Sequence, residues 1–108
     1  MPHNADFSKI QNVSTIDVNP TGWVNPITIE YGISSDAMAS YYWRIKGTQH
    51  TFTIPVMRLD FISSGEYEKH FRETLESFRD EYLEWKKDGF RTEWSREYRD
   101  QYSRYINI

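Results

Sequence analysis

Three side chains in one stretch of the chain have the residue types of a metal or acid–base site. Glu66, His70 and Glu73 are spaced by four and three residues, which places them along one flank of a predicted helix. A carboxylate, an imidazole and a second carboxylate could hold a hard cation or transfer a proton. Such a site needs a further ligand from another element, and the sequence identifies none. We therefore interpret these residues as part of a solvated helix face, and a small hydrolase or metal-dependent enzyme is the third of three functional hypotheses.

Arginines alternate with aromatic residues in the C-terminal segment. Aromatic rings beside guanidinium groups hold single-stranded nucleic acids by stacking and charge. In a helix, however, these aromatic residues share one stripe and the arginines scatter around the remainder, which is typical of a core-facing helix with a mixed-charge exterior. The formal net charge of −3 also disfavours a protein held by phosphate groups. A nucleic-acid-contacting module is therefore the second hypothesis, with candidate residues Arg96, Arg99, Tyr102 and Arg104.

Signatures of nucleophilic catalysis and nucleotide binding are missing from the sequence. The chain contains no Gly-x-Ser-x-Gly, no Gly-x-x-x-x-Gly-Lys and no Gly-x-Gly-x-x-Gly motif. It also has no cysteine, which excludes disulfides, thiol nucleophiles and cysteine-bound metals. His50 lies among Thr and Gln residues and is interpreted as a polar strand residue. We expect a protein that is not an enzyme, with no cofactor and no metal.

The elements that would position these residues change in character near Ser64. Before it the chain is rich in Thr, Ile, Val and Tyr and is interrupted by Gly, Pro and Asn, which is typical of strands and turns. Alternating apolar residues predict strands at 14–18, 27–33, 41–46 and 50–54, the last two forming a hairpin. A bulge or strand end is expected near Pro55, and the strand could resume through Phe61.

After Ser64 the apolar residues recur with a helical period. One stripe predicts a helix over 65–88, capped by Ser63 or Ser64 and stopped by Gly89, with the stripe residues Tyr67, Phe71, Leu75, Phe78, Tyr82 and Trp85. A second helix is predicted over 92–105. We therefore expect an α+β fold, with an antiparallel sheet of about four strands over 13–62 and two helices packed on it. Residues 1–12 are expected to be a flexible segment and 13–108 a single domain, while the sheet face that the helices cover is left open.

The chain is unusually aromatic, with eight tyrosines, six phenylalanines and four tryptophans in 108 residues. Tyr and Trp are enriched at binding hot spots, and one small core does not hide all of them. Tyr42 shares a predicted strand face with Arg44 and Lys46, opposite the apolar face. On the first helix, acidic and basic residues run down opposite flanks, and Leu83 points away from the apolar stripe. Candidate protein-binding residues are therefore Tyr42, Arg44, Lys46, Leu83, Arg79 and Glu84.

The leading hypothesis is a small binding module or accessory or inhibitor protein that acts through protein–protein contacts, of the kind that viruses and mobile elements encode. Its partner is another protein or a second copy of the chain, and nucleic acid is disfavoured as a partner. No apolar run is long enough to cross a membrane, and the N-terminus lacks the basic and apolar blocks of a secretory signal. We therefore expect a soluble protein of the cytoplasm with no membrane contact.

Overall fold

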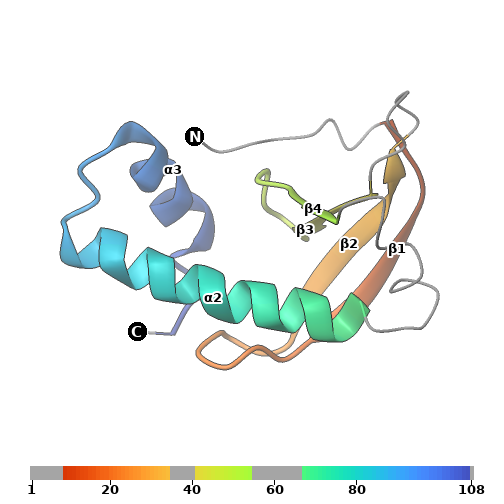
Figure 1. Ribbon diagram of the computed structural model, residues 1–108, viewed down its shortest axis with the longest axis horizontal. Coiled ribbons are helices and arrows are strands. Elements are labelled where there is room, and N and C mark those ends of the chain that lie inside the picture. Colours follow the sequence, from red (N-terminus) through yellow and green to blue (C-terminus); the bar gives the residue numbers. More distant parts are fainter. Residues whose placement is uncertain (1–8, 35–40, 55–66, 108) are drawn as a thin grey trace.

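The computed structural model describes residues 9–34, 41–54 and 67–107 (Figure 1). Four strands, β1 (Ile10–Val18), β2 (Ile27–Ser34), β3 (Tyr41–Ile45) and β4 (Phe52–Ile54), form an antiparallel sheet in the order β1-β2-β3-β4. The helices α2 (Tyr67–Lys87) and α3 (Glu93–Tyr102) follow. The predicted α+β fold, with an antiparallel sheet and two C-terminal helices, is thus confirmed.

Some sequence expectations fall at or beyond the edges of these ranges. The bulge near Pro55, the strand through Phe61 and the caps at Ser63 and Ser64 all lie outside the described residues. Strand β1 begins at Ile10, which lies inside the segment 1–12 that we assigned to a flexible N-terminus. Ile10 is buried, and it pairs with Ser34 of β2. The ordered sheet therefore starts earlier than the alternation pattern indicates.

The sheet separates an apolar face from a polar one, as its alternation predicts. On the apolar face, Ile29 of β2 pairs with Ile16 of β1 and Ile45 of β3, and Tyr31 pairs with Trp43. The helices cover this face, since their buried residues belong to the same core cluster as these strand residues. Ile33 follows in the same alternation but is 45% exposed. The first described residue of α2 is Tyr67, and its ring packs on Tyr31. The described part of α2 therefore covers the sheet as far as Tyr31 but not Ile33.

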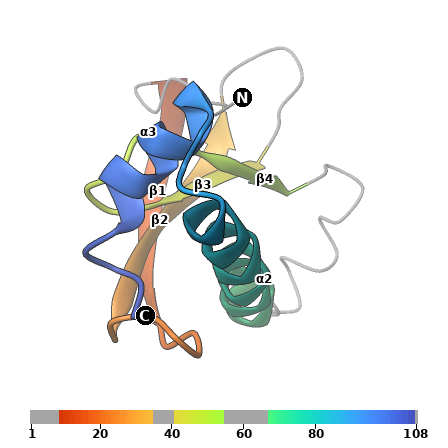
Figure 2. The same ribbon diagram turned by 90° about the vertical axis from the view of Figure 1, so that its left-hand side faces the viewer.

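Helix α2 lies along the sheet (Figures 1 and 2), and its predicted stripe is turned towards the core. The four central stripe residues are buried, and the two terminal ones, Tyr67 and Trp85, are half-buried against the core. Glu68 in the first turn and Lys86 and Lys87 in the last turn complement the helix dipole. The ring of Phe78 lies at the centre of the aromatic core, in contact with the rings of Trp23, His50, Phe52, Trp85, Tyr98 and Tyr102.

After α3 the chain returns to the turn between β1 and β2, which places the C-terminal residues beside that turn in Figure 1. The second helix ends at Tyr102, so its predicted end at residue 105 is wrong. The residues beyond it pair with the turn instead: Ile106 forms an isolated bridge with Trp23, and the Val24 amide donates to the Tyr105 carbonyl at 2.8 Å. Trp23 is buried, and its indole donates to the carbonyl of Leu75 at 3.0 Å. These contacts satisfy backbone groups that a longer helix would have paired within itself.

Arg79 of α2 holds the β1–β2 turn against the C-terminal residues. We call this set of contacts the closure of Gly22, Arg79 and Asn107. Its guanidinium donates to the carbonyl of Gly22 at 3.0 Å and to the carbonyl of Asn107 at 2.8 Å. The Asn107 amide in turn donates to the Gly22 carbonyl. Gly22 has a φ of 85°, and a Cβ atom there would overlap the Arg79 side chain. This position therefore requires glycine for both its backbone conformation and the space that Arg79 occupies.

The two glycines Gly22 and Gly89 offer a matched test of this closure. Both have a positive φ, but a Cβ atom at Gly89 would meet nothing within 4 Å. We expect Gly89→Ala to lower the free energy of unfolding by about 1–2 kcal/mol through backbone strain alone. Gly22→Ala should cost clearly more, because it also displaces Arg79. Urea denaturation measures both losses, and equal losses would contradict the packing of Arg79 against Gly22.

Tyr31 is one of several buried tyrosines that contribute to the loss of stability at alkaline pH. Burial, together with its hydrogen bond to Tyr67, raises the pKa of Tyr31 to about 12. An unfolded tyrosine ionises near pH 10, so the unfolded chain loses this proton first and the folded state loses stability as pH rises from 10 to 12. We expect the urea midpoint to fall more steeply between pH 10 and pH 12 in the parent protein than in Tyr31→Phe. Parallel declines in the two proteins would show that Tyr31 does not contribute.

Candidate binding pocket

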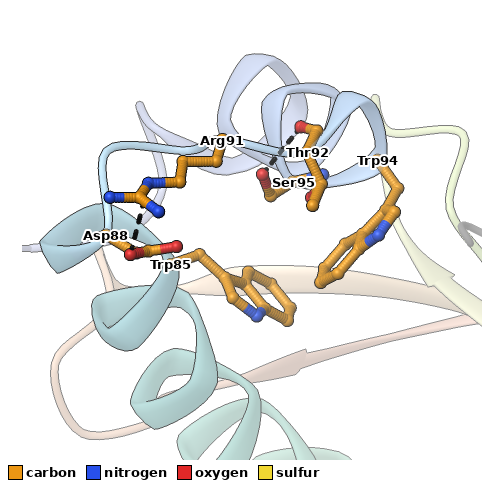
Figure 3. Close-up of a pocket in the computed structure, with 6 residues that line it drawn as sticks. All are labelled: Trp85, Asp88, Arg91, Thr92, Trp94 and Ser95. Atoms are coloured by element: carbon orange, nitrogen blue, oxygen red, sulfur yellow. Dashed lines mark hydrogen bonds and ion pairs between the residues drawn. The ribbon is translucent and has the colours of Figure 1, made fainter.

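The connection between α2 and α3 forms a pocket that opens to solvent (Figure 3). We call it the tryptophan pocket. Its volume is about 250 Å³, and its lining residues are Trp85, Asp88, Arg91, Thr92, Trp94 and Ser95. Sites for small organic ligands usually enclose roughly 300–1,000 Å³. The pocket therefore suits a single amino-acid side chain better than a nucleotide or another cofactor.

Two residues with positive φ turn the chain out of α2 and shape one end of the pocket. Gly89 has a φ of 82° and Phe90 a φ of 52°. A positive φ is uncommon for a residue with a side chain, and here it is held by local contacts. The Phe90 amide donates to the Trp85 carbonyl at 2.9 Å, and the Phe90 ring packs on Tyr82. The turn is thus held by a backbone hydrogen bond and by a side-chain contact.

Thr92 then starts α3 at the rim of the pocket. Its side-chain oxygen accepts the Ser95 amide at 3.2 Å, while the Ser95 hydroxyl donates to the Thr92 carbonyl at 2.8 Å. This pair satisfies one of the free amides of the first helical turn. Arg96 reaches back from the same turn and donates to the Arg91 carbonyl at 3.0 Å. The first turn of α3 and the connection before it are therefore one hydrogen-bonded unit.

Two half-buried tryptophans make adjoining walls of the pocket. The ring centroids of Trp85 and Trp94 lie 5.1 Å apart, with their planes at 87°. Trp85 stacks on Tyr98 at 5.1 Å, and Tyr98 packs in turn on Phe78 in the core. By contrast, Trp23 and Trp43 are fully buried. The pocket thus offers indole surface that is held in place by the core and still reaches solvent.

Charged groups stand at the rim. Asp88 and Arg91 form an ion pair at 3.6 Å, with side chains 62% and 78% exposed. Burial raises the pKa of Tyr98, and the nearby carboxylates of Glu81 and Glu97 add to that rise. Those two carboxylates therefore lie close to the aromatic wall that Tyr98 supports. Basic groups stand at the same connection, since Arg91 pairs with Asp88 and Arg96 is bonded to the Arg91 carbonyl.

Sequence reasoning missed this pocket because it placed both tryptophans on core-facing stripes. The stripes are correct, but Trp85 ends one and Trp94 begins the other, on either side of Gly89. A large aromatic residue at each end of a helix–turn–helix connection was the available signal. The helical period shows which face a residue takes but not how far the covering element extends.

The predicted surface on the sheet lies on the polar face, away from the helices. Tyr42 pairs with Gly32 and Thr53 and is half-buried. Arg44 donates to the Glu30 carboxylate at 3.1 Å across the strands, and Lys46 is exposed just beyond the end of β3. The shared strand face of Tyr42 and Arg44 is therefore confirmed. Its use as a binding surface stays a prediction.

The predicted surface on α2 is less continuous than the sequence indicates. Leu83, which we expected to be exposed, is half-buried. Arg79 is engaged in the closure of Gly22 and Asn107, and Glu84 is exposed. A helical wheel drawn for α2 alone does not include the cover that the rest of the fold gives to a residue outside the apolar stripe. These three residues do not form one open surface.

The arginines proposed for nucleic acid have partners within α3 and its flanks. Arg99 pairs with Asp100 at 3.1 Å and lies over the Phe90 ring, and Arg104 lies over the Tyr105 ring. Arg96 is bonded to the connection, as described above. Tyr102, the aromatic residue among these candidates, is fully buried, with its hydroxyl 2.8 Å from Nδ1 of His50, so its ring is not accessible for stacking on a base. The aromatic stripe of α3 faces the core, as its helical pattern predicts.

His50 is a core residue, and its interpretation as an ordinary polar strand residue is wrong. It is buried between the rings of Phe52 and Phe78, with Nε2 3.4 Å from the Tyr98 hydroxyl. Its backbone amide donates to the Gln101 side chain at 2.8 Å. The imidazole is retained inside because α3 supplies hydroxyl partners to both ring nitrogens, which a strand pattern cannot reveal. Burial raises the pKa of Tyr102, the closer of these partners.

Several negative results apply to the parts of the chain that the structure describes. Glu66 lies outside them, Glu73 is exposed, and His70 is half-buried near the rings of Trp43 and Phe71. Within residues 9–34, 41–54 and 67–107, no three His, Asp or Glu side chains are grouped so that they could hold a metal ion. Neither described helix combines the length and apolar character needed to cross a bilayer. No protein-family model, curated protein or solved structure matches the chain.

The cap at Thr92 gives a direct test of how the pocket rim is held. We expect Thr92→Ala to lower the free energy of unfolding by about 1 kcal/mol, because the Ser95 amide loses its acceptor. Thr92→Ser keeps a hydroxyl at the same place and should stay close to the parent. Thermal and urea unfolding of the three proteins provide the comparison. If the serine variant loses as much as the alanine variant, the methyl group of Thr92 and not its hydrogen bond is responsible.

Proposed function

We propose that this protein is a small binding module without catalytic activity, and that it recognises another protein by receiving one of its side chains in the tryptophan pocket. The observation that carries the proposal is the pair of half-buried tryptophans lining a solvent-open pocket of about 250 Å³. Tryptophan is among the residues most enriched in the energetic centres of protein interfaces. Two half-buried tryptophans side by side at a solvent-open pocket therefore favour this pocket as the contact surface.

The side chains of the pocket are held in place by neighbouring residues, so binding a partner would cost little side-chain entropy. Trp85 is stacked on Tyr98, and Tyr98 is packed on the Phe78 ring of the core. The rim is fixed by the Thr92 cap and by the bond from Arg96 to the Arg91 carbonyl. A site that is already ordered before binding avoids much of the entropy cost of ordering side chains at an interface.

The distribution of polar groups also supports a protein partner. Interfaces combine an apolar centre with a charged or polar rim. Here the indole rings form the centre, and Asp88, Arg91 and Thr92 surround it. On the polar face of the sheet, the aromatic side chain of Tyr42 is flanked by Gly32 and Thr53 and not by a second aromatic residue.

A display selection tests the proposal with the full-length protein. Random peptides selected on the parent protein should bind it and should lose about tenfold or more in affinity for Trp94→Ala, which corresponds to about 1.4 kcal/mol. Titration of the indole fluorescence or calorimetry measures the affinities. Trp94→Phe, which keeps an aromatic ring, should retain part of the binding.

Two controls make this selection decisive. Tyr42→Ala removes an aromatic side chain from the opposite sheet face and should leave peptide affinity unchanged. The melting temperature of each variant shows whether a loss of binding reflects a loss of folding. If the selected peptides bind Trp94→Ala and Trp94→Phe as well as the parent, or if no peptide is enriched, the tryptophan pocket is not the recognition site.

A further inference from the structure

We infer that the side chain which the tryptophan pocket receives from a partner is a basic one, an arginine. This inference rests on the proposed function and names the chemistry of its ligand. It follows from three features of the pocket: the orientation of its indole rings, the charge around them and the ion pair that already occupies the rim.

The indole rings suit a guanidinium group. Tryptophan has the aromatic face that attracts cations most strongly, and arginine stacks its planar guanidinium on such faces. Trp85 and Trp94 present planes at 87°, so a flat group that stacks on one indole meets the other at an adjoining wall. The methylene stem of arginine can line the apolar surface in the rest of this pocket, whose whole volume is about 250 Å³.

The charge around the pocket favours a cation. Asp88 lines the pocket itself, one helical turn after Trp85. Glu81 lies one turn before Trp85 and Glu97 lies one turn after Trp94, and both are close enough to Tyr98 to raise its pKa. Three carboxylates thus flank the aromatic wall, beside the two guanidinium groups of Arg91 and Arg96 at the connection, and the chain as a whole carries a formal net charge of −3. A basic partner is complementary to this field.

The ion pair at the rim is itself a contact between a guanidinium group and the Asp88 carboxylate. Arg91 reaches Asp88 at 3.6 Å, and both side chains are largely exposed. Exposed pairs of this kind contribute little to stability, so an incoming guanidinium can displace Arg91 from Asp88 at small cost. In the free protein Arg91 therefore takes the place that the partner's arginine would take at this carboxylate.

An acidic ligand would need the opposite arrangement. It would bind Arg91 and the first amides of α3, where a helix N-terminus attracts anions. The Ser95 amide of that turn is already bonded to Thr92, and Glu93 adds a negative charge in the first turn. The rim is therefore less suited to a carboxylate than to a guanidinium.

Four blocked pentapeptides of the form Gly-Gly-X-Gly-Gly test the inference, with X as Arg, citrulline, Leu or Glu. Citrulline has nearly the shape of arginine but no charge. Each peptide is titrated into the full-length protein up to millimolar concentration, and the indole N–H signals of Trp85 and Trp94 are followed by NMR. We expect the Arg peptide to bind at least about tenfold more tightly than the citrulline peptide, because the missing charge removes both the cation–π and the carboxylate contacts.

Two substitutions at the rim should change the affinity for the Arg peptide in opposite directions. Asp88→Asn should weaken the Arg peptide several-fold, whereas Arg91→Ala should strengthen it by removing the internal competitor. Glu68→Gln removes one negative charge at the far end of α2 and serves as the matched control, with affinity expected to stay close to the parent. These exposed substitutions are expected to leave the melting temperature nearly unchanged.

The outcomes separate this inference from the proposed function. Tightest binding of the Glu peptide overturns the inference in favour of an acidic ligand. Weaker binding of the Arg peptide by Arg91→Ala contradicts the displacement of Arg91 from Asp88 and overturns the inference as well. Tightest binding of the Leu peptide, or equal binding of the Arg and citrulline peptides, overturns it in favour of an apolar side chain, and the pocket remains a protein-binding site. If none of the four peptides binds, the inference is overturned, and the display selection with Trp94→Ala decides the proposed function on its own.

Discussion

The ring of Phe78 is the packing element on which the rest of this structure depends. It projects from the middle of α2 and meets rings from the β1–β2 turn, the β3–β4 connection, β4, the end of α2 and helix α3. Most domains of this size fill such a centre with aliphatic side chains. Aromatic rings prefer particular edge-to-face and offset orientations, so a core made of them fixes the angles between elements as well as their distances.

The same ring packing links the interior to the surface. From Phe78 the contacts pass to Tyr98, from Tyr98 to Trp85, and from Trp85 to Trp94 at the tryptophan pocket. His50 belongs to this packing because the hydroxyls of Tyr98 and Tyr102 reach its two nitrogens. A polar residue within an aromatic core thus specifies which strand connection faces which helix. Both the order of the core and the shape of the pocket depend on where α3 lies.

The sequence predicts regular elements well and their junctions poorly, for physical reasons. The spacing from Tyr67 to Trp85 identifies α2 because a helical period reports one buried face. Trp23 and Ile106 have no such period, since each lies in irregular chain, and their burial depends on a contact between distant segments. His50 and Tyr102 depend on each other in the same way. The tryptophan pocket forms where the apolar stripes of α2 and α3 separate at Gly89. The relative orientation of the two helices at that point depends on the tertiary fold, which a periodic pattern does not describe.

The closure of Gly22, Arg79 and Asn107 has a consequence for the entropy cost of folding. The hairpins of the sheet join neighbouring segments, so their loops close at a small entropy cost. The bridge between Trp23 and Ile106 joins segments that are far apart along the chain, so its loop closes at a larger entropy cost than the loop of either hairpin. The burial of Trp23 and Ile106, together with the hydrogen bonds of Arg79, offsets that cost.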